Sequence, residues 1–133
     1  MSLKYLADTH ILLWAFTDSG KLSADIKAIL EDDETEVFYS PVSLWEIAIK
    51  YGLGKLVIQG CTPEEFLVEL ETSFFTYRPL GRQTLVSSYH LPAYHKDPFD
   101  RLLFWEAIRG DLVLLSADTR SDAYIPAGLQ VIH

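Results

Sequence analysis

The sequence predicts a three-layer α/β/α domain in which helices cover both faces of a central, mostly parallel sheet of four to five strands. Helical and strand-like patterns alternate along the whole 133-residue chain, which is typical of a parallel sheet. Hydrophobic residues make up 49% of the chain, enough for a packed core. Because the sequence shows no internal repeat, low-complexity tract or Pro/Gly/Ser-rich linker, we expect one domain over residues 1–133.

The first half of the chain predicts two strands and three helices. Ser23 has the polar side chain expected of a helix N-cap, and Ser40 followed by Pro41 is a strong helix start. Gly52 is a typical residue at which a helix ends. The predicted strands are residues 4–7 and 37–39, and the predicted helices are about 9–16, 23–33 and 41–52.

The second half continues the alternation. Thr62-Pro63-Glu64-Glu65 is a capping-box signature with proline at the first helical position. Pro92 should stop a helix, and Asp97-Pro98 should start one that ends near Gly110. The predicted helices are about 62–72, 83–90 and 97–110, and the predicted strands are 74–77, 112–115 and 129–132.

Composition narrows the classes of function and location. The longest apolar runs, such as residues 11–16, fall far short of the ~20 residues that span a bilayer. The start, Met1-Ser2-Leu3-Lys4, lacks the features of a secretory signal, so we expect a cytoplasmic protein. Cys61 is the single cysteine, which excludes an internal disulfide and indicates an inert thiol.

The net charge of -8 argues against a surface built for generic phosphate binding. Two interpretations stay open. Acids concentrated for metal binding can coexist with a local basic rim that holds RNA, or the acidic surface can meet a basic protein partner. The basic residues near the acids in sequence are Lys50, Lys55, Lys96, Arg101 and Arg120.

Two acids directly follow predicted strands. Asp8 comes after the strand at residues 4–7, and Asp118 comes shortly after the strand at 112–115. Ligands of open α/β sheets bind beyond the carboxyl ends of the strands, so both acids have a functional position. The structural alternatives are a helix N-cap for Asp8 and an Asx turn for Asp118.

Glu46 is a carboxylate among apolar residues in the predicted helix at 41–52. Two structural explanations compete with a functional one: a capping box with Ser43, or an ion pair with Lys50 four residues later. Since Ser40 is the better helix start, Glu46 should lie well inside the helix, on or beside its buried face. A buried charge needs a partner, which a metal or a neighbouring cation would supply.

The segment Asp97-Pro98-Phe99-Asp100 carries two acids with different positions in one helix start. Proline at the first helical position assigns Asp97 to the N-cap. Asp100 then lies in the first turn, where the helix dipole favours the ionised form that metals bind. We therefore favour Asp100 as a ligand and keep Asp97 as a weaker candidate.

Four acids gathered at one place would repel one another unless a cation joined them. Oxygen ligands select hard cations, and the sequence shows no His/Cys cluster, which leaves Mg²⁺ first and Mn²⁺ second. The histidines His10, His90, His95 and His133 show no ligand spacing. His10 follows Asp8 closely enough to approach the site, but we favour a helix-start or partly buried role for it.

The pattern resembles the PIN-domain family, and in particular the VapC-type toxins of toxin-antitoxin pairs. The resemblance spans nearly the whole chain and rests on the order and spacing of several segments. These are residues 5–10 (YLADTH), 43–47 (SLWEI), 54–56 (GKL), 95–103 (HKDPFDRLL) and 115–118 (LSAD). The resemblance implies a PIN-like fold whose metal-binding acids are Asp8, Glu46, Asp100 and Asp118.

The resemblance also implies an activity: magnesium-dependent hydrolysis of RNA phosphodiester bonds, in which the metal polarises the phosphate and activates a water. Asp118 would complete the ligand shell or orient that water, and supporting contacts are expected from Thr9, Ser116 and Thr119. Family members are typically toxins inhibited by a cognate antitoxin and commonly form homodimers, so both kinds of partner are expected.

Two other classes stay open. A Mg²⁺-dependent phosphatase or phosphoacceptor domain would also place an acid where Asp8 lies, but the second acid that either needs near Asp8 is missing. A non-catalytic interaction module would require that all four acids are caps or solvated charges. Metal binding separates this module from both enzymes.

Overall fold

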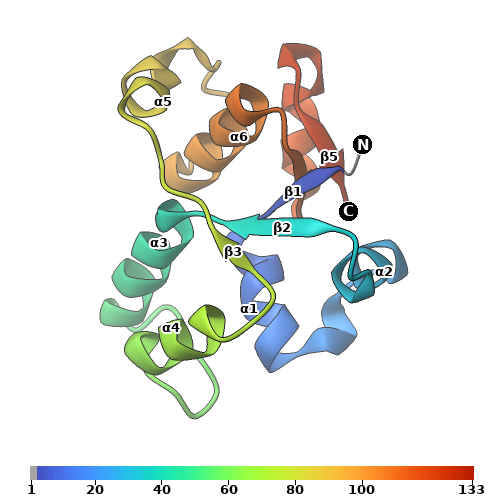
Figure 1. The fold of residues 1–133 in the computed structure, drawn as a ribbon. Helices are drawn as coiled ribbons and strands as arrows, with labels where there is room; N and C mark the ends of the chain where they lie inside the picture. The colour runs from blue at the N-terminus through green and yellow to red at the C-terminus, as the bar shows by residue number, and fades with distance from the viewer. Residues whose placement is uncertain (1–2) are drawn as a thin grey trace.

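Five parallel strands form the central sheet of the computed structural model, which describes residues 3–133. The strand order is β3-β2-β1-β4-β5 (Figure 1). The strands are β1 (Lys4–Ala7), β2 (Glu36–Tyr39), β3 (Thr76–Tyr77), β4 (Val113–Leu115) and β5 (Gln130–Ile132). All neighbouring pairs run parallel, so the strands end at one common edge. The predicted mostly parallel sheet is confirmed. Met1 and Ser2, on which the expectation of no secretory signal partly rests, lie outside the described residues.

Helices cover both faces of this sheet. The helices are α1 (Thr9–Thr17), α2 (Ala24–Glu31), α3 (Pro41–Gly52), α4 (Pro63–Glu71), α5 (Arg82–Ser87) and α6 (Pro98–Gly110), with short 3-10 helices η1 (Ser19–Lys21), η2 (Ser88–His90) and η3 (Thr119–Ala127). Helices α1, α2 and α4 lie on one face, and α5, α6 and η3 lie on the other (Figure 1). The three-layer α/β/α prediction is therefore confirmed.

Two hydrophobic clusters form the core, one on each face of the sheet. Successive side chains of a strand point to opposite faces, so Tyr5 and Ala7 pack in one cluster and Leu6 packs in the other. Helix α3 lies between the layers, because its Ile47 joins the first cluster and its Val42 joins the second. Since α3 carries Glu46, this position turns that carboxylate inward.

The predicted helix starts are confirmed at atomic level. The Ser23 Oγ accepts a hydrogen bond from Ile26 N, and the Ser40 Oγ accepts one from Val42 N. Thr62 and Glu65 make both hydrogen bonds of the capping box. These contacts satisfy backbone N–H groups that the first turn of a helix leaves unpaired.

Two elements differ from the sequence prediction because local hydrogen bonds compete with the regular pattern. The predicted strand at 74–77 is reduced to Thr76–Tyr77, since the Ser73 hydroxyl accepts a hydrogen bond from Phe75 N and turns the backbone there. The predicted helix at 83–90 is α5 followed by the tighter η2.

The 3-10 helix η3 was not predicted. A 3-10 helix has three residues per turn and lacks the period of an α-helix, and Pro126 within η3 is typical of a loop. The segment is nevertheless anchored in the core by Tyr124, whose side chain is completely buried. Asp118 is the N-cap of η3, so the packing of this helix positions one of the candidate site acids.

A buried ion pair holds α6, the helix that carries two candidate acids. The Arg78 Nη1 lies 3.1 Å from the Glu106 Oε2, and the Glu106 side chain is fully buried. Gly110 leaves room for this arginine, because a Cβ there would lie 2.5 Å from the Arg78 Nη2. Within residues 3–133, no helix has the length and apolar character needed to cross a membrane.

Candidate functional site

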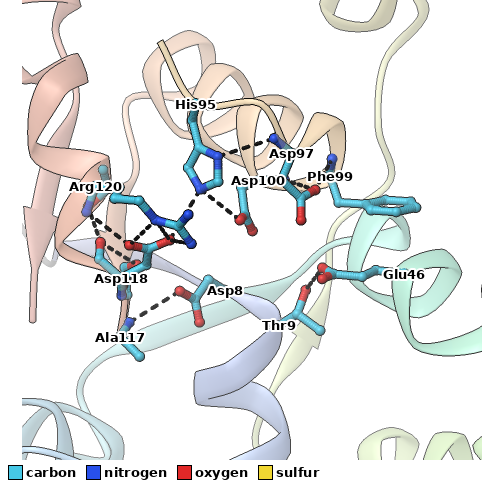
Figure 2. A network of polar contacts seen from close by, with 12 residues as sticks. Asp8, Thr9, Glu46, His95, Asp97, Phe99, Asp100, Ala117, Asp118 and Arg120 are labelled. Carbon is cyan, nitrogen blue, oxygen red and sulfur yellow. Dashed lines mark hydrogen bonds and ion pairs between the residues drawn. The ribbon is translucent and has the colours of Figure 1, made fainter. Parts of the chain in front are cut away.

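The predicted acids converge beyond the carboxyl edge of the sheet. Four of them line a common cavity of about 370 Å³: Asp8, Asp97, Asp100 and Asp118. Glu46 reaches the same place through its contact with Lys50, which also lines the cavity. Figure 2 shows these carboxylates pointing toward one another from different elements. The predicted clustering of the acids is thus present in the folded chain.

Asp8 joins the ends of β1 and β4. Its Oδ1 accepts a hydrogen bond from Ile11 N at 2.9 Å, and its Oδ2 accepts one from Ala117 N at 3.2 Å. Asp8 therefore has the predicted N-cap role and lies at the site as well. Burial raises the pKa of the Asp8 carboxyl above its ordinary value, and the hydrogen bonds from Ile11, Ser116 and Ala117 oppose that rise.

Glu46 is held by a threonine and a lysine. The Thr9 Oγ1 donates a hydrogen bond to the Glu46 Oε1 at 2.6 Å, and the Lys50 Nζ contacts the Oε2. The predicted ion pair with Lys50 is confirmed. The alternative capping box with Ser43 is wrong, because the helix starts at Ser40 and the Ser43 hydroxyl contacts Thr9.

Asp97 caps α6, and Asp100 lies at the centre of the site. The Asp97 Oδ1 accepts hydrogen bonds from Phe99 N and Asp100 N, while its Oδ2 lies 3.8 Å from the Lys50 Nζ. Asp97 therefore both caps the helix and faces the other acids. Two groups of side chains have ligand atoms within 4.8 Å of one another, and Asp100 belongs to both: Glu46–Asp97–Asp100 and His95–Asp100–Asp118.

His95 is a site residue that sequence reasoning missed. Its Nε2 lies 3.1 Å from the Asp100 Oδ2 and 3.2 Å from the Asp118 Oδ2 (Figure 2). The Nδ1 accepts a hydrogen bond from Asp97 N, so the Nε2 must carry the proton shared with the two carboxylates. The sequence spacing gave His95 no ligand role, whereas the structure places it against two of the candidate acids. The contact of His95 with Asp118 spans 23 residues, so no local pattern could have indicated it.

Asp118 is bound by an arginine that follows it in sequence. The Arg120 Nη2 lies 2.8 Å from the Asp118 Oδ2, and Arg120 N donates to the Oδ1 at 2.9 Å. The predicted Asx-type turn is therefore formed, with the carboxylate still at the cavity. Burial acts to raise the pKa of Asp118, but hydrogen bonds from Arg120 and His95 outweigh it and lower the pKa to about 2.

The predicted supporting residues lie at the site. Thr9 binds Glu46 directly, the Ser116 Oγ accepts a hydrogen bond from Asp118 N at 3.0 Å, and Thr119 lines the cavity. His10 lines the cavity too, although a structural role at the helix start was the favoured interpretation.

The predicted basic rim is partly gathered at the site. Lys50 and Arg120 line the acid cavity, and Lys96 lines a neighbouring one. The linings of these two cavities do not include Lys55 or Arg101.

Asp100 bears the electrostatic cost of gathering the acids. Burial, followed by the charges of Asp97 and Glu46, raises the pKa of Asp100 to about 7, although His95 opposes this. At neutral pH the carboxyl therefore keeps its proton in part, because ionisation would place a further negative charge beside Asp97 and Glu46. Because the donors are mainly carboxylate oxygens, the site suits a hard divalent metal such as Mg²⁺.

This raised pKa predicts a pH-dependent gain of stability in Asp100→Asn. The folded carboxyl has a pKa of about 7, against 3.8 for an ordinary aspartate, so the wild-type chain loses stability as pH rises from about 4 to about 7. In EDTA the variant should unfold at a higher temperature than the wild type. Its free energy of unfolding should be greater by roughly 1–3 kcal/mol, and this gain should be larger at pH 8 than at pH 5. Circular dichroism melts measure this. Asp33→Asn, an exposed turn acid, is the control; an equal gain at both pH values would contradict the prediction.

The position of His95 predicts its effect on metal binding. His95→Ala removes the donor between Asp100 and Asp118 and should weaken Mg²⁺ or Mn²⁺ affinity by about 10- to 100-fold, as loss of such supporting groups does. His95→Gln keeps an N–H donor and should retain more of the affinity. Isothermal titration calorimetry checks both variants, and unchanged affinity in His95→Ala would show that the histidine positions neither carboxylate.

The fold and the site together define a class of protein: a parallel α/β domain with an acidic, oxygen-rich site beyond the carboxyl ends of its strands. Residues 5–124 match the family described as PIN domain. The chain belongs to the PIN-domain family. No curated protein sequence matches the chain significantly.

Solved structures share the fold at low sequence identity. VapBC2 from Rickettsia felis, bound to a DNA fragment from its promoter, is 14% identical with a TM-score of 0.67, covering 98% of each chain. DNA-bound VapBC from Salmonella typhimurium is 21% identical with a TM-score of 0.66, covering 98% of this chain and 97% of the other. A toxin-antitoxin complex from Klebsiella pneumoniae is 18% identical with a TM-score of 0.61, covering 97% and 96%. These similarities concern the fold.

Proposed function

We propose that the protein is a Mg²⁺-dependent endoribonuclease of the VapC type, acting as the toxin of a toxin-antitoxin pair in the cytoplasm. The observation that carries this proposal is the convergence of carboxylates from separate elements on one cavity, with Asp100 shared between two ligand-like groups. Membership of the PIN-domain family supports a nuclease.

The donor set supports Mg²⁺, with Mn²⁺ as the second choice. In the arrangement described, the Nδ1 of His95 accepts a hydrogen bond from Asp97 N, and its Nε2 faces two carboxylates. Both ring nitrogens are thus engaged, which leaves carboxylate oxygens as the ligands. Oxygen ligands favour Mg²⁺ and Mn²⁺ over zinc.

The metal-binding residues in this proposal are Asp8, Glu46, Asp100 and Asp118, with Asp97 as a weaker candidate. Bound Mg²⁺ would polarise the scissile phosphate and lower the pKa of a water molecule. Backbone N–H groups fix the Asp8 carboxylate, and Thr9 fixes Glu46.

In this proposal, the cationic side chains of Arg120 and Lys50 help the acid cavity to accept a negatively charged RNA. The guanidinium of Arg120 lies beside Asp118, whose low pKa keeps this carboxylate ionised and able to orient a water. The ammonium of Lys50 lies between Glu46 and Asp97 and reduces the negative charge that an approaching phosphate meets. The His95 Nε2 contacts the carboxylates of both Asp100 and Asp118 and so holds them in position relative to each other.

Cleavage of RNA by conservative variants tests the proposal. Asp8→Asn and Asp100→Asn remove a charged ligand and should lower Mg²⁺-dependent cleavage at least about 100-fold, more than the loss of a supporting group. Asp97→Asn keeps a capping side chain and should retain substantially more activity, while the exposed Asp33→Asn should match wild type. Cleavage of labelled single-stranded and structured RNAs with Mg²⁺ or EDTA measures this.

Several outcomes would overturn the assignment. Full activity in both Asp8→Asn and Asp100→Asn would contradict it. Absence of both cleavage and metal binding in the wild type would favour the interaction module. Phosphoryl transfer to Asp8 would favour the phosphoacceptor class, although backbone N–H groups already occupy both Asp8 oxygens.

A cognate antitoxin and a homodimer are part of the proposal. Structures with this fold are described as VapBC and as a toxin-antitoxin complex, and the net charge of -8 suits a basic partner. We expect the antitoxin to place a basic side chain in the acid cavity. Cleavage should therefore be blocked in the co-purified complex and restored when the partner is removed. A complex that cleaves RNA as fast as the free chain would contradict this expectation.

A further inference from the structure

A second cavity of about 590 Å³ adjoins the acid cavity. Asp97 and Arg120 line both, so the two cavities are neighbours at these side chains. The lining of the second cavity is Tyr94, His95, Lys96, Asp97, Arg120 and Ala123. Its volume lies within the range of sites for small organic ligands. It combines the aromatic ring of Tyr94 with the cations Lys96 and Arg120, and Asp97 is the one acid in its lining, whereas four aspartates line the acid cavity.

Tyr94 presents an open aromatic face to this cavity. Tyr94 is 69% exposed, so its ring is accessible from solvent. The ring rests on Tyr124, with 5.5 Å between centroids, and Tyr124 is itself completely buried. The Tyr124 hydroxyl accepts a hydrogen bond from His95 N at 2.8 Å. Tyr94 is thus supported from behind and tied through Tyr124 to the site histidine.

The cations of the second cavity are placed for a phosphate. Lys96 is exposed, and the Arg120 side chain is 71% exposed although its guanidinium contacts Asp118. Lys96 and Arg120 thus bring positive charge to the cavity that Tyr94 lines, on a chain with a net charge of -8. Proteins that bind single-stranded nucleic acids combine backbone-binding cations with aromatic rings on which bases stack.

We propose that the second cavity binds one unpaired nucleotide of the RNA substrate, next to the phosphate that is cleaved. The base stacks on Tyr94, and its flanking phosphate contacts Lys96 and Arg120. This inference rests on the proposed ribonuclease function and adds a preference for single-stranded RNA, because a base within a duplex has no free face for Tyr94. Arg120 links the two cavities and sets the distance between stacked base and scissile phosphate.

Binding of a fluorescein-labelled single-stranded RNA, measured by anisotropy in EDTA, tests the stacking contact without cleavage. Tyr94→Ala should weaken binding roughly tenfold, the scale of one base–aromatic stack, whereas Tyr94→Phe should bind like wild type. Tyr89→Ala is the matched control, since Tyr89 is 78% exposed and lines neither cavity. The same sequence as a duplex should bind more weakly.

A separate measurement tests the proposed contact between Lys96 and the flanking phosphate. The slope of log affinity against log salt should fall by about 0.7 in Lys96→Ala, as expected for one contact with a single strand. Lys4→Ala should leave the slope unchanged, because Lys4 starts β1 at the opposite edge of the sheet. An unchanged slope in Lys96→Ala would remove the lysine from the proposed subsite.

The outcomes separate the subsite from the proposed function. RNA binding that depends on Tyr94, without cleavage in Mg²⁺, would support the subsite and contradict the nuclease. The subsite would be overturned if the protein cleaves RNA but Tyr94→Ala binds RNA as tightly as the wild type. It would also be overturned if Tyr94→Ala and Tyr89→Ala lose equal amounts of RNA affinity. So would undetectable RNA binding by the wild type. If Tyr94→Ala instead weakens only a co-purified protein partner, the surface belongs to that partner and the subsite is also overturned.

Discussion

Repulsion among carboxylates at the edge of the sheet is the constraint on which the site depends. Asp100 lies where two groups of acids meet, and its pKa of about 7 records the cost of that position. A fold without a use for this charge would gain stability by replacing Asp100, as proteins commonly trade stability for active-site chemistry. The acids are therefore best understood as a site that a divalent cation completes.

The fold holds these acids in place with short-range contacts rather than with long loops. Parallel strands bring Asp8 and Asp118 to one edge, and the buried position of α3 turns Glu46 inward. The N-cap of α6 then sets Asp97 and Asp100 three residues apart at the start of one helix. Each carboxylate also accepts a hydrogen bond from another group of the protein or forms an ion pair with one, so these contacts organise the cavity without a metal.

Local signals explain how much could be predicted from sequence. Strand patterns, serine and threonine caps and Pro41, Pro63 and Pro98 depend on neighbouring residues, and they correctly indicated the fold and the acids that cluster. The role of His95 depends on Asp118, 23 residues away, and local patterns carry no such information. Helix η3 was missed because a 3-10 helix lacks the α-helical period and contains Pro126. The assignment of individual acids as metal ligands remains a prediction.

A crystal structure of the chain soaked with Mn²⁺, analysed by anomalous scattering, tests the central claim most directly, since Mn²⁺ accepts the same oxygen ligands as Mg²⁺. Our account predicts an anomalous peak in the acid cavity, coordinated by oxygens of Asp8, Glu46, Asp100 or Asp118, with His95 beside the ligands. A cavity without metal at saturating Mn²⁺, or a metal bound elsewhere, would contradict the account.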